Sequence, residues 1–438
     1  MKRIFLLLTL FCAGLYVSAQ NSYQMSRLDS LFHLLEKENK MMGSISIQKA
    51  GLEIYNKQFG FCDVATQLKP KATSVYRIGS ISKMFTAVMI LQLVDENKLS
   101  LEAKLSDFYP SVPHSDRITI DQMLGHRSGI HSITDDSAYL GYLSTYQSHE
   151  QLLQRIVASE SEFEPGAKTA YSNSNYILLG YILEKVTGFD YQINLETRIT
   201  RPLSLHYTRY GSAITPENGN CYSYKYENKE VIKEVETDMS IPGGAGAIIS
   251  TPIELNHFIK ALFDGKLLSA NSLNKMTDLK EHFGYGIFAM PFYDHKGFGH
   301  TCGIDGFRSS LSWFPDDSLA IAICVNAADY NPNEALIGAL SILLNKEYKL
   351  PVFNVVTVDE ALLTTYTGVY SSPDFPLKMN ITLKDKHLFG MASGQSAFPL
   401  APVDETTFRF DQAGIVITFG TNTLTIKQGG MNIQMKKE

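Results

Sequence analysis

Residues 76–93 read YRIGSISKMFTAVMILQL, and the candidate chemistry of the chain is organised around this stretch. From Met84 onward the apolar residues recur at helical spacing over a run too long for a strand, which predicts a buried helix. Ser80 opens this helix directly after Gly79, and Lys83 follows three residues later. Residues at i and i+3 of a helix have Cβ atoms about 5–6 Å apart, so the amine can reach the hydroxyl. The helix N-terminus also stabilises negative charge that develops beside it.

The S-x-x-K spacing occurs at two other places, and the sequence context separates them from the first. Ser46 and Lys49 lie in an alternating stretch that predicts a strand, where an offset of three places side chains on opposite faces. Ser272 and Lys275 lie in a polar stretch that is typical of a solvated surface. The occurrence at Ser80 is therefore the candidate for chemistry.

A serine hydroxyl needs an adjacent base to become a nucleophile. Lys83 can be that base only if burial or a neighbouring cation lowers its pKa. The alternative is that Ser80 caps the helix and Lys83 is an ordinary first-turn residue. The chain has no G-x-S-x-G, H-E-x-x-H, Walker or G-x-G-x-x-G motif, so S-x-x-K is the best remaining signal of chemistry.

Two further motifs strengthen the case for a nucleophile. The run YSN at 171–173 precedes an apolar helical stretch. A loop tyrosine can relay protons if nearby cations depress its pKa, and an asparagine amide can accept from lysine and donate to a substrate amide. The run GHTCG at 299–303 leads into a predicted strand, where His300 and Thr301 would project from an edge that can pair with an extended substrate. The plainer alternatives are a turn cluster at Tyr171 and an ordinary core or surface histidine.

Strands and helices alternate around these motifs from about residue 26 to residue 344, which predicts a mixed α/β (α+β) domain spanning 20–348. Gly51 turns one predicted hairpin, and Pro315-Asp316-Asp317 turns another. The predicted strands are 44–48, 52–59, 309–313 and 319–325, and the predicted helices are 84–93, 176–186, 253–263 and 335–344.

The character of the sequence changes after Tyr348. Residues 349–356 are typical of a linker, and 357–438 consist of short alternating stretches separated by turns. This pattern predicts a small all-β domain, a barrel or a sandwich.

The N-terminus has a basic start, a short apolar stretch and small residues before Ala19. This layout predicts a signal peptide at 1–19 and therefore an exported protein, periplasmic or secreted. The alternative, a membrane anchor, would need a longer apolar run, so we expect no transmembrane segment after cleavage. The formal net charge of −6 and the lack of a basic run argue against a nucleic-acid partner.

Cleavage would leave four cysteines, without C-x-x-C or Cys/His ligand spacing. A zinc site or a disulfide framework is therefore not expected, and the fold should depend on its apolar core. One or two disulfides stay open in an oxidising compartment, without a pairing that the sequence can assign. The four residues are Cys62, Cys221, Cys302 and Cys324.

S-x-x-K, Y-x-N and a basic residue followed by Thr, in this order, resemble the serine β-lactamase and penicillin-binding protein superfamily. The Y-S-N form resembles the class C β-lactamase branch, and the His-Thr start resembles its D-Ala-D-Ala carboxypeptidases, D-aminopeptidases and esterases. The resemblance implies a β-lactamase/transpeptidase-like fold, with an antiparallel sheet flanked by helices, and a C-terminal small β-barrel (lipocalin-like) domain. Other matching segments are YRIGSISKMF at 76–85, MLGHRSG at 123–129, FEPG at 163–166 and GGAG at 243–246.

The resemblance also implies a role for each motif residue. Ser80 would attack a carbonyl to form an acyl-enzyme, and Lys83 and Tyr171 would share the proton transfers. Asn173 would orient Lys83 and the substrate. A water activated by Tyr171 would then release the acyl group, so the resemblance implies neither a metal ion nor a cofactor.

On the substrate side, the resemblance implies that His300 and Thr301 bind the polar end of the substrate. The backbone N–H groups of Ser80 and Gly303 would form the oxyanion hole. Two positions depart from the family. His300 stands where many β-lactamases have lysine, and a neutral imidazole anchors a carboxylate less strongly than an ammonium does. Cys302 replaces a glycine and can crowd the strand edge that faces substrate.

Three functional hypotheses follow. The leading one is a serine hydrolase that cleaves an amide or ester bond, with D-amino-acid (cell-wall type) peptides as the expected partner molecules. The second is a β-lactamase that opens the β-lactam ring. The third is a catalytically degenerate penicillin-binding or sensing protein, which Cys302 motivates.

Overall fold

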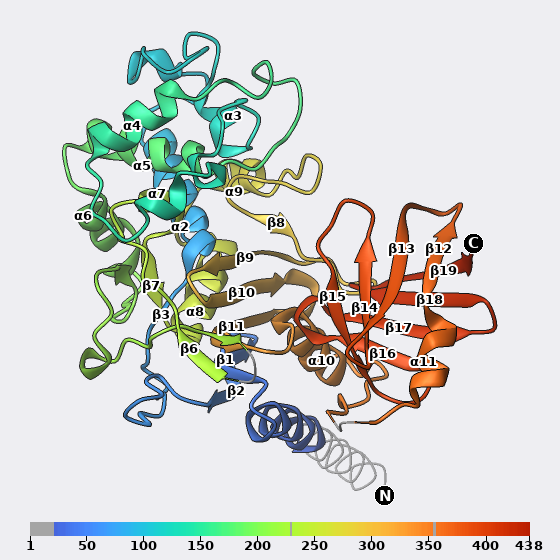
Figure 1. Ribbon diagram of the computed structural model, residues 1–438. Helices are drawn as coiled ribbons and strands as arrows, with labels where there is room; N and C mark the ends of the chain where they lie inside the picture. Colours follow the sequence, from blue (N-terminus) through green and yellow to red (C-terminus); the bar gives the residue numbers. More distant parts are fainter. Residues whose placement is uncertain (1–21, 228–229, 354–355) are drawn as a thin grey trace, which may run out of the picture. The chain divides into compact units, whose positions relative to one another are not determined.

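The computed structural model describes residues 22–227, 230–353 and 356–438, so the predicted signal peptide lies outside the described residues. The contacts divide the chain into two units, which Figure 1 colours along the sequence. One unit is 41–327, and the other combines the described residues up to Lys40 with 328–438. In the described part of the chain, no helix has both the length and the apolar character needed to cross a bilayer.

A six-stranded sheet runs through the unit 41–327 in the order β2-β1-β11-β10-β9-β8. The pairs β1/β2, β8/β9, β9/β10 and β10/β11 are antiparallel. Strand β11 is buried except at its last residue, which explains its continuous apolar sequence. Both predicted hairpins are present, and Ser318 closes the second one in a left-handed conformation. The strands are β1 (Met41–Lys49), β2 (Leu52–Phe59), β8 (Phe288–Ala289), β9 (Phe298–Ile304), β10 (Phe307–Phe314) and β11 (Leu319–Ala328).

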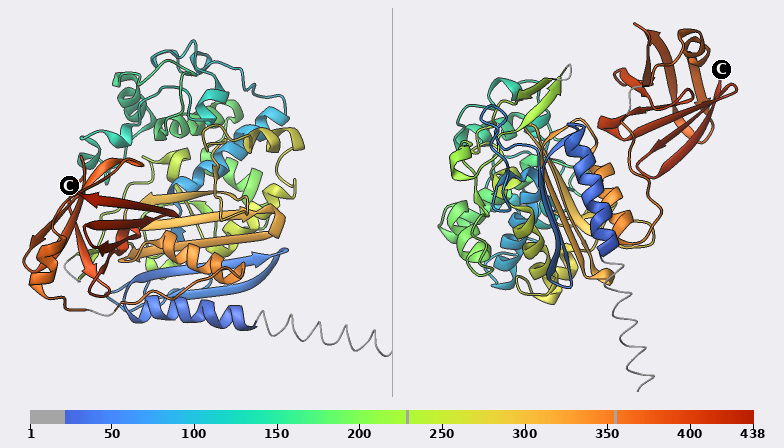
Figure 2. Two further views of the ribbon diagram at one scale, coloured as in Figure 1. Left: turned by 90° about the vertical axis from the view of Figure 1, so that its right-hand side faces the viewer. Right: turned by 90° about the horizontal axis from the view of Figure 1, so that it is seen from below.

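The helices of this unit gather on one face of the sheet, as the right-hand view of Figure 2 shows. Helix α2 is buried on nearly all sides, and its Phe85 ring stacks on Phe258 of α8 with centroids 3.7 Å apart. The predicted helices over 253–263 and 176–186 are confirmed as α8 and α5: Thr251 caps α8 by accepting the Glu254 N–H, and Gly188 ends α5 at φ 74°. The helices are α2 (Ser82–Asp95), α3 (Ile120–Leu124), α4 (His149–Ala158), α5 (Asn173–Thr187), α6 (Tyr191–Leu195), α7 (Gly243–Gly246), α8 (Pro252–Phe263) and α9 (Ala270–Met276).

Two small sheets complete this unit. A three-stranded sheet in the order β3-β7-β4 carries the chain to the start of α2, and β5 pairs with β6 in a hairpin. These strands are β3 (Tyr76–Arg77), β4 (Arg209–Tyr210), β5 (Tyr224–Glu227), β6 (Glu230–Lys233) and β7 (Ile248–Ser250).

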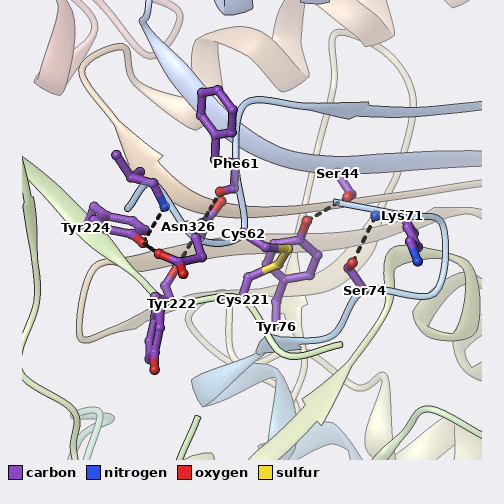
Figure 3. The surroundings of a disulfide bond; sticks show 12 residues. Ser44, Phe61, Cys62, Lys71, Ser74, Tyr76, Cys221, Tyr222, Tyr224 and Asn326 are labelled. Atoms are coloured by element: carbon purple, nitrogen blue, oxygen red, sulfur yellow. Dashed lines mark hydrogen bonds between the residues drawn. A yellow bond between two sulfur atoms is a disulfide. The ribbon is translucent and has the colours of Figure 1, made fainter. Parts of the chain in front are cut away.

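A disulfide joins Cys62 to Cys221 across 159 residues of sequence (Figure 3). The Asn326 amide of β11 donates to the carbonyls of Phe61 and Tyr222, next to each cysteine, so the bridge is also tied to the sheet. In the chain-entropy picture, a loop of this length corresponds to about 5 kcal/mol of stability. The structure thus supplies the pairing that the sequence left open. Cys302 and Cys324 are free and buried.

The second unit contains a closed barrel of eight strands, β12 to β19, with a core of its own. This confirms the predicted all-β region, although the sequence analysis missed the short helix α11, which stacks Tyr366 on Phe419. The barrel strands are β12 (Gly368–Ser372), β13 (Phe375–Lys384), β14 (His387–Ala392), β15 (Phe398–Pro402), β16 (Thr407–Phe410), β17 (Ile415–Gly420), β18 (Thr423–Gln428) and β19 (Met431–Lys437), and α11 is Glu360–Tyr366.

Two further helices belong to the second unit by their contacts. Helix α10 (Pro332–Leu343) confirms the predicted closing helix. The Gln24 amide, on a helix over the described residues 22–37, donates to the Leu343 carbonyl at 2.9 Å. The domain limits at 20–348, 349–356 and 357–438 stay a prediction. They were drawn from the change in composition along the chain, whereas the two units described above are defined by contacts between residues.

Candidate active site

Ser80 lies in the 3-10 turn η1 (Gly79–Ile81), and α2 begins two residues later at Ser82. It therefore precedes the α-helix, which corrects the expectation that it opens the helix. It is the N-cap of neither element, so its hydroxyl is free for side-chain partners. Gly79 has φ +41°, and a Cβ at this position would overlap the sulfur of Cys302. The turn thus needs glycine immediately before Ser80.

Lys83 is completely buried, and its Nζ donates to three acceptors around Ser80. These are Ser80 Oγ at 3.2 Å, Asn173 Oδ1 at 2.7 Å and the Ala245 carbonyl at 2.8 Å. Burial lowers the pKa of Lys83 to about 7. The neutral amine can keep two N–H donors on Asn173 and Ala245 while its lone pair accepts the proton of Ser80.

Tyr171 donates its O–H to Ser80 Oγ at 2.8 Å. Burial raises the pKa of Tyr171 above its ordinary value. This differs from the expectation of a tyrosine whose pKa neighbouring cations depress, because desolvation disfavours the phenolate and the adjacent lysine has itself lost much of its cationic character. Tyr171 is thus a proton donor in the resting site, and Lys83 is the group suited to accept a proton.

Asn173 begins α5 and joins Lys83 to a loop. Its Oδ1 accepts from Lys83, and its Nδ2 donates to Thr134 Oγ1 at 2.8 Å. Both ends of the amide are therefore engaged within the protein, although Asn173 also lines the pocket at Ser80. Thr134 was not predicted as a site residue, because its 3-10 turn η3 (Ile133–Asp135) is brought to α5 only in the folded chain.

Strand β9 places His300 and Thr301 on opposite faces, as neighbours on a strand must be. His300 is buried, its ring stacks on Phe288 at 4.0 Å and its Nδ1–H donates to the Thr301 carbonyl. Burial, assisted by Lys83, lowers the pKa of His300 to about 3, so the imidazole is neutral at ordinary pH. His300 lies 6.3 Å from Tyr171, ring to ring, and neither it nor the exposed Thr301 lines the pocket at Ser80.

The two expected oxyanion donors, Ser80 and Gly303, both line this pocket. Cys302 precedes Gly303 on β9, and its sulfur lies against Gly79, next to the backbone of Ser80. Burial raises the pKa of the Cys302 thiol to about 12, so the group is neutral. The thiol is thus a neighbour of one of the two expected backbone donors.

The pocket at Ser80 has a volume of about 690 Å³, enough for a short peptide segment. Arg308 lines it, is exposed and lies against Gly303. The sequence analysis did not select Arg308, because nothing in the local pattern shows that its partner across the β9/β10 ladder is Gly303. The other lining residues include Thr134, Tyr139, Leu143, Asn173, Ile177, Glu234, Thr237, Ala245 and Asp305.

A buried histidine, His126, contacts the segment 170–172 that carries Tyr171. Its Nδ1 accepts the Ser172 N–H at 3.2 Å, its carbonyl accepts the Ala170 N–H, and its ring lies 4.5 Å from that of Tyr171. Burial lowers the pKa of His126 well below its ordinary value, so the ring is neutral and can remain in this core. The segment MLGHRSG at 123–129 was noted in the sequence as resembling the family, but the contacts of His126 with the Tyr171 segment are seen only in the structure.

A hydroxyl held by a buried amine and a phenol, beside backbone N–H groups at a strand edge, is the arrangement of a nucleophilic serine. The sheet with helices on one face places these groups at the junction of η1, α5 and β9. Fold and site together define a serine hydrolase of the β-lactamase and penicillin-binding protein superfamily.

The chain belongs to the beta-lactamase family, whose model matches residues 34–345. Among characterised relatives, it is 24% identical over 429 residues to penicillin-binding protein 4* of Bacillus subtilis (strain 168), covering 90% of this chain and 93% of that protein. The predicted superfamily is thus confirmed.

Two solved structures support the fold. The D-stereospecific amidohydrolase of a Streptomyces species is 27% identical, with a TM-score of 0.61 over 69% of this chain and 94% of that chain. The octameric penicillin-binding protein homologue of Pyrococcus abyssi is 22% identical, with a TM-score of 0.65 over 96% of this chain and 100% of that chain. The second match shows that the fold extends over nearly the whole chain.

Proposed function

We propose that the protein is an exported serine hydrolase that forms an acyl-enzyme on Ser80 and cleaves an amide or ester bond of D-amino-acid peptides of the cell-wall type. The observation that carries the proposal is the pair of hydrogen bonds that Ser80 Oγ makes with Lys83 and Tyr171. The disulfide supports export, because such bonds persist mainly in oxidising compartments.

In the proposed first step, neutral Lys83 accepts the Ser80 proton while Oγ attacks the substrate carbonyl carbon. The carbonyl oxygen becomes an oxyanion that the N–H groups of Ser80 and Gly303 stabilise. The bond to the leaving group then breaks, and Tyr171 gives its proton to the departing nitrogen or oxygen. The ammonium of Lys83 returns a proton to Tyr171, so the serine proton has in effect passed to the leaving group.

In the proposed second step, a water replaces the leaving group. Lys83 and Tyr171 take a proton from this water as its oxygen attacks the acyl carbon, and the proton ends on Ser80 when the acyl bond breaks. His300 stays neutral throughout and supports Tyr171 from the protein side. No step needs a group from outside the chain apart from water.

Arg308 is the cation best placed to hold a substrate carboxylate, because it is exposed beside Gly303, whereas His300 is neutral and buried. A guanidinium can bind a carboxylate through two parallel hydrogen bonds. We therefore propose that Arg308 takes over the anchoring role that the resemblance assigned to His300. The D-stereospecific relative supports the choice of D-configured substrates.

We expect D-alanyl-D-alanine peptides or D-amino-acid amides to be hydrolysed about tenfold or more faster, in kcat/KM, than their L-enantiomers. The measurement is a panel of both enantiomers with short esters and a chromogenic cephalosporin, assayed with the mature protein. Equal rates for the enantiomers would contradict the substrate assignment. Fastest turnover of the cephalosporin would instead establish the β-lactamase alternative.

Removing the sulfur beside the Ser80 N–H should make the site faster. We expect Cys302→Ala to raise the second-order rate of acylation by a fluorescent penicillin about tenfold, because one oxyanion donor is no longer shared. Cys324→Ala is the matched control, since Cys324 is the other free, buried cysteine of the same sheet. An unchanged or lower rate in a folded Cys302→Ala protein would show that the thiol does not restrict the hole.

A further inference from the structure

A second pocket, of about 540 Å³, lies next to the one at Ser80. Consecutive residues of α7 line both: Gly243 and Gly244 face the second pocket, whereas Ala245 and Gly246 face the first. The proposed chemistry uses none of the side chains described below. We refer to this site, lined by residues of α4, α5 and the segments 210–213 and 236–240, as the tyrosine pocket.

The tyrosine pocket is aromatic and acidic. Three carboxylates line it against one guanidinium, that of Arg77, which already pairs with Glu236 and with the buried Asp305. The Asp, Glu and Arg side chains of the lining therefore carry a net negative formal charge. The aromatic residues are Tyr146, Tyr181, Tyr191 and Tyr210, and the acidic residues are Glu184, Glu236 and Asp238.

Tyr181 provides an independent indication of a ligand. Its side chain is 4% exposed, and its hydroxyl is buried without a hydrogen-bond partner. The neighbouring hydroxyls are satisfied, since Tyr210 donates to the Met239 carbonyl and Tyr191 pairs with Thr86. An unpaired buried hydroxyl is unfavourable, so this atom is suited to accept a hydrogen bond from a bound molecule.

Glu184 lies beside Tyr181, on the next turn of α5. One carboxylate oxygen accepts the Tyr191 N–H at 2.8 Å, and the other lies 3.5 Å from His149 Nδ1. The His149 ring in turn stacks on Tyr181 at 3.9 Å. Burial raises the pKa of Glu184, which shows that the contacts within the protein do not fully offset the loss of water around this carboxylate.

We propose that the tyrosine pocket binds a small organic cation, a primary amine with a short carbon chain. Its ammonium donates to the Tyr181 hydroxyl and to the Glu184 carboxylate, and the faces of the tyrosine rings attract the same positive charge. Its carbon chain packs against the tyrosine rings. A metal ion fits less well, because the described residues contain no group of three metal-binding His, Cys, Asp or Glu side chains.

The test is calorimetric titration of the mature protein with cadaverine, and with the neutral 1,5-pentanediol as the reference ligand. We expect saturable binding of cadaverine alone. Glu184→Gln should weaken it about tenfold, because the charge-assisted hydrogen bond is lost. Tyr181→Phe should weaken it severalfold without lowering the melting temperature, because the deleted hydroxyl has no partner in the empty protein.

Glu234→Gln is the matched control, since Glu234 is an acidic residue that lines the pocket at Ser80 and not the tyrosine pocket. Binding that survives in Glu234→Gln and falls in the two tyrosine-pocket variants supports the proposal. Three results would overturn it: no saturable binding of cadaverine, equal binding of the diol, or loss of binding in Glu234→Gln alone. None of these outcomes depends on whether Ser80 is reactive.

Discussion

Ser80→Ala is expected to abolish covalent labelling by a fluorescent penicillin or a fluorophosphonate, and to lower hydrolysis by about 10⁴-fold or more. The hydroxyl of Ser80 is the atom on which the hydrogen bonds of Lys83 and Tyr171 converge, and no other side chain of the site offers an oxygen at that position. The measurement is gel fluorescence of the labelled protein together with the rate on the best substrate of the panel. The substitution removes one part-exposed oxygen, so the fold should survive.

Ser272→Ala is the control for this experiment, because Ser272 carries the same S-x-x-K spacing on α9. Its hydroxyl donates to Asp95, which ends α2 at the opposite end of that helix from Lys83, and Lys275 is exposed. Labelling and turnover should match those of the unaltered protein. Undiminished labelling of Ser80→Ala, with a normal melting temperature, would show that the nucleophile lies elsewhere.

Activity is expected to rise with pH through a pKa of about 7 and then to level off. Only the neutral amine of Lys83 can accept the Ser80 proton, and burial places the pKa of Lys83 at about 7. Below this value the ammonium predominates, so kcat/KM should fall about tenfold for each further pH unit. Lys83→Met should lower kcat/KM by about 10²–10⁴ and remove the dependence on this group.

His300 cannot account for such a profile, because its pKa of about 3 leaves it neutral over the range measured. Tyr171 cannot account for it either, because its pKa is raised above the ordinary value for a phenol. Lys275→Met, the lysine of the α9 motif, serves as the matched control. A flat profile across neutrality, or the same inflection in Lys83→Met, would assign the base to another group.

Local patterns were sufficient for most of the fold. Helix α2 follows from the apolar run after Met84, and α8 follows from Thr251 and Pro252 at its start. The barrel strands follow from period-two alternation, which depends only on neighbours in sequence. The sequence did not predict helix α11 or the limits of η1. The ends of helices are decided by a few hydrogen bonds that composition does not encode.

The sequence alone predicted which groups carry the chemistry, because the order of Ser80-x-x-Lys83, Tyr171-x-Asn173 and His300-Thr301 can be read without coordinates. What each group does depended on the tertiary structure. Burial sets the pKa of Lys83 near neutrality and raises that of Tyr171, which reverses the expected state of the tyrosine. Desolvation is a property of the surrounding packing, and no local pattern contains it.

Contacts between segments that are separate in sequence were also decided by the fold alone. The Cys62–Cys221 pair, the Ala245 carbonyl at Lys83 and the position of Arg308 beside Gly303 all join segments that are remote in sequence or lie across a strand pair. Strand alternation then placed His300 on the buried face of β9 that it shares with Cys302, where its ring stacks on Phe288. The sequence therefore predicted the nucleophile and its neighbours, whereas three-dimensional packing set the pKa values of Lys83 and Tyr171 and placed Arg308 in the lining of the pocket at Ser80.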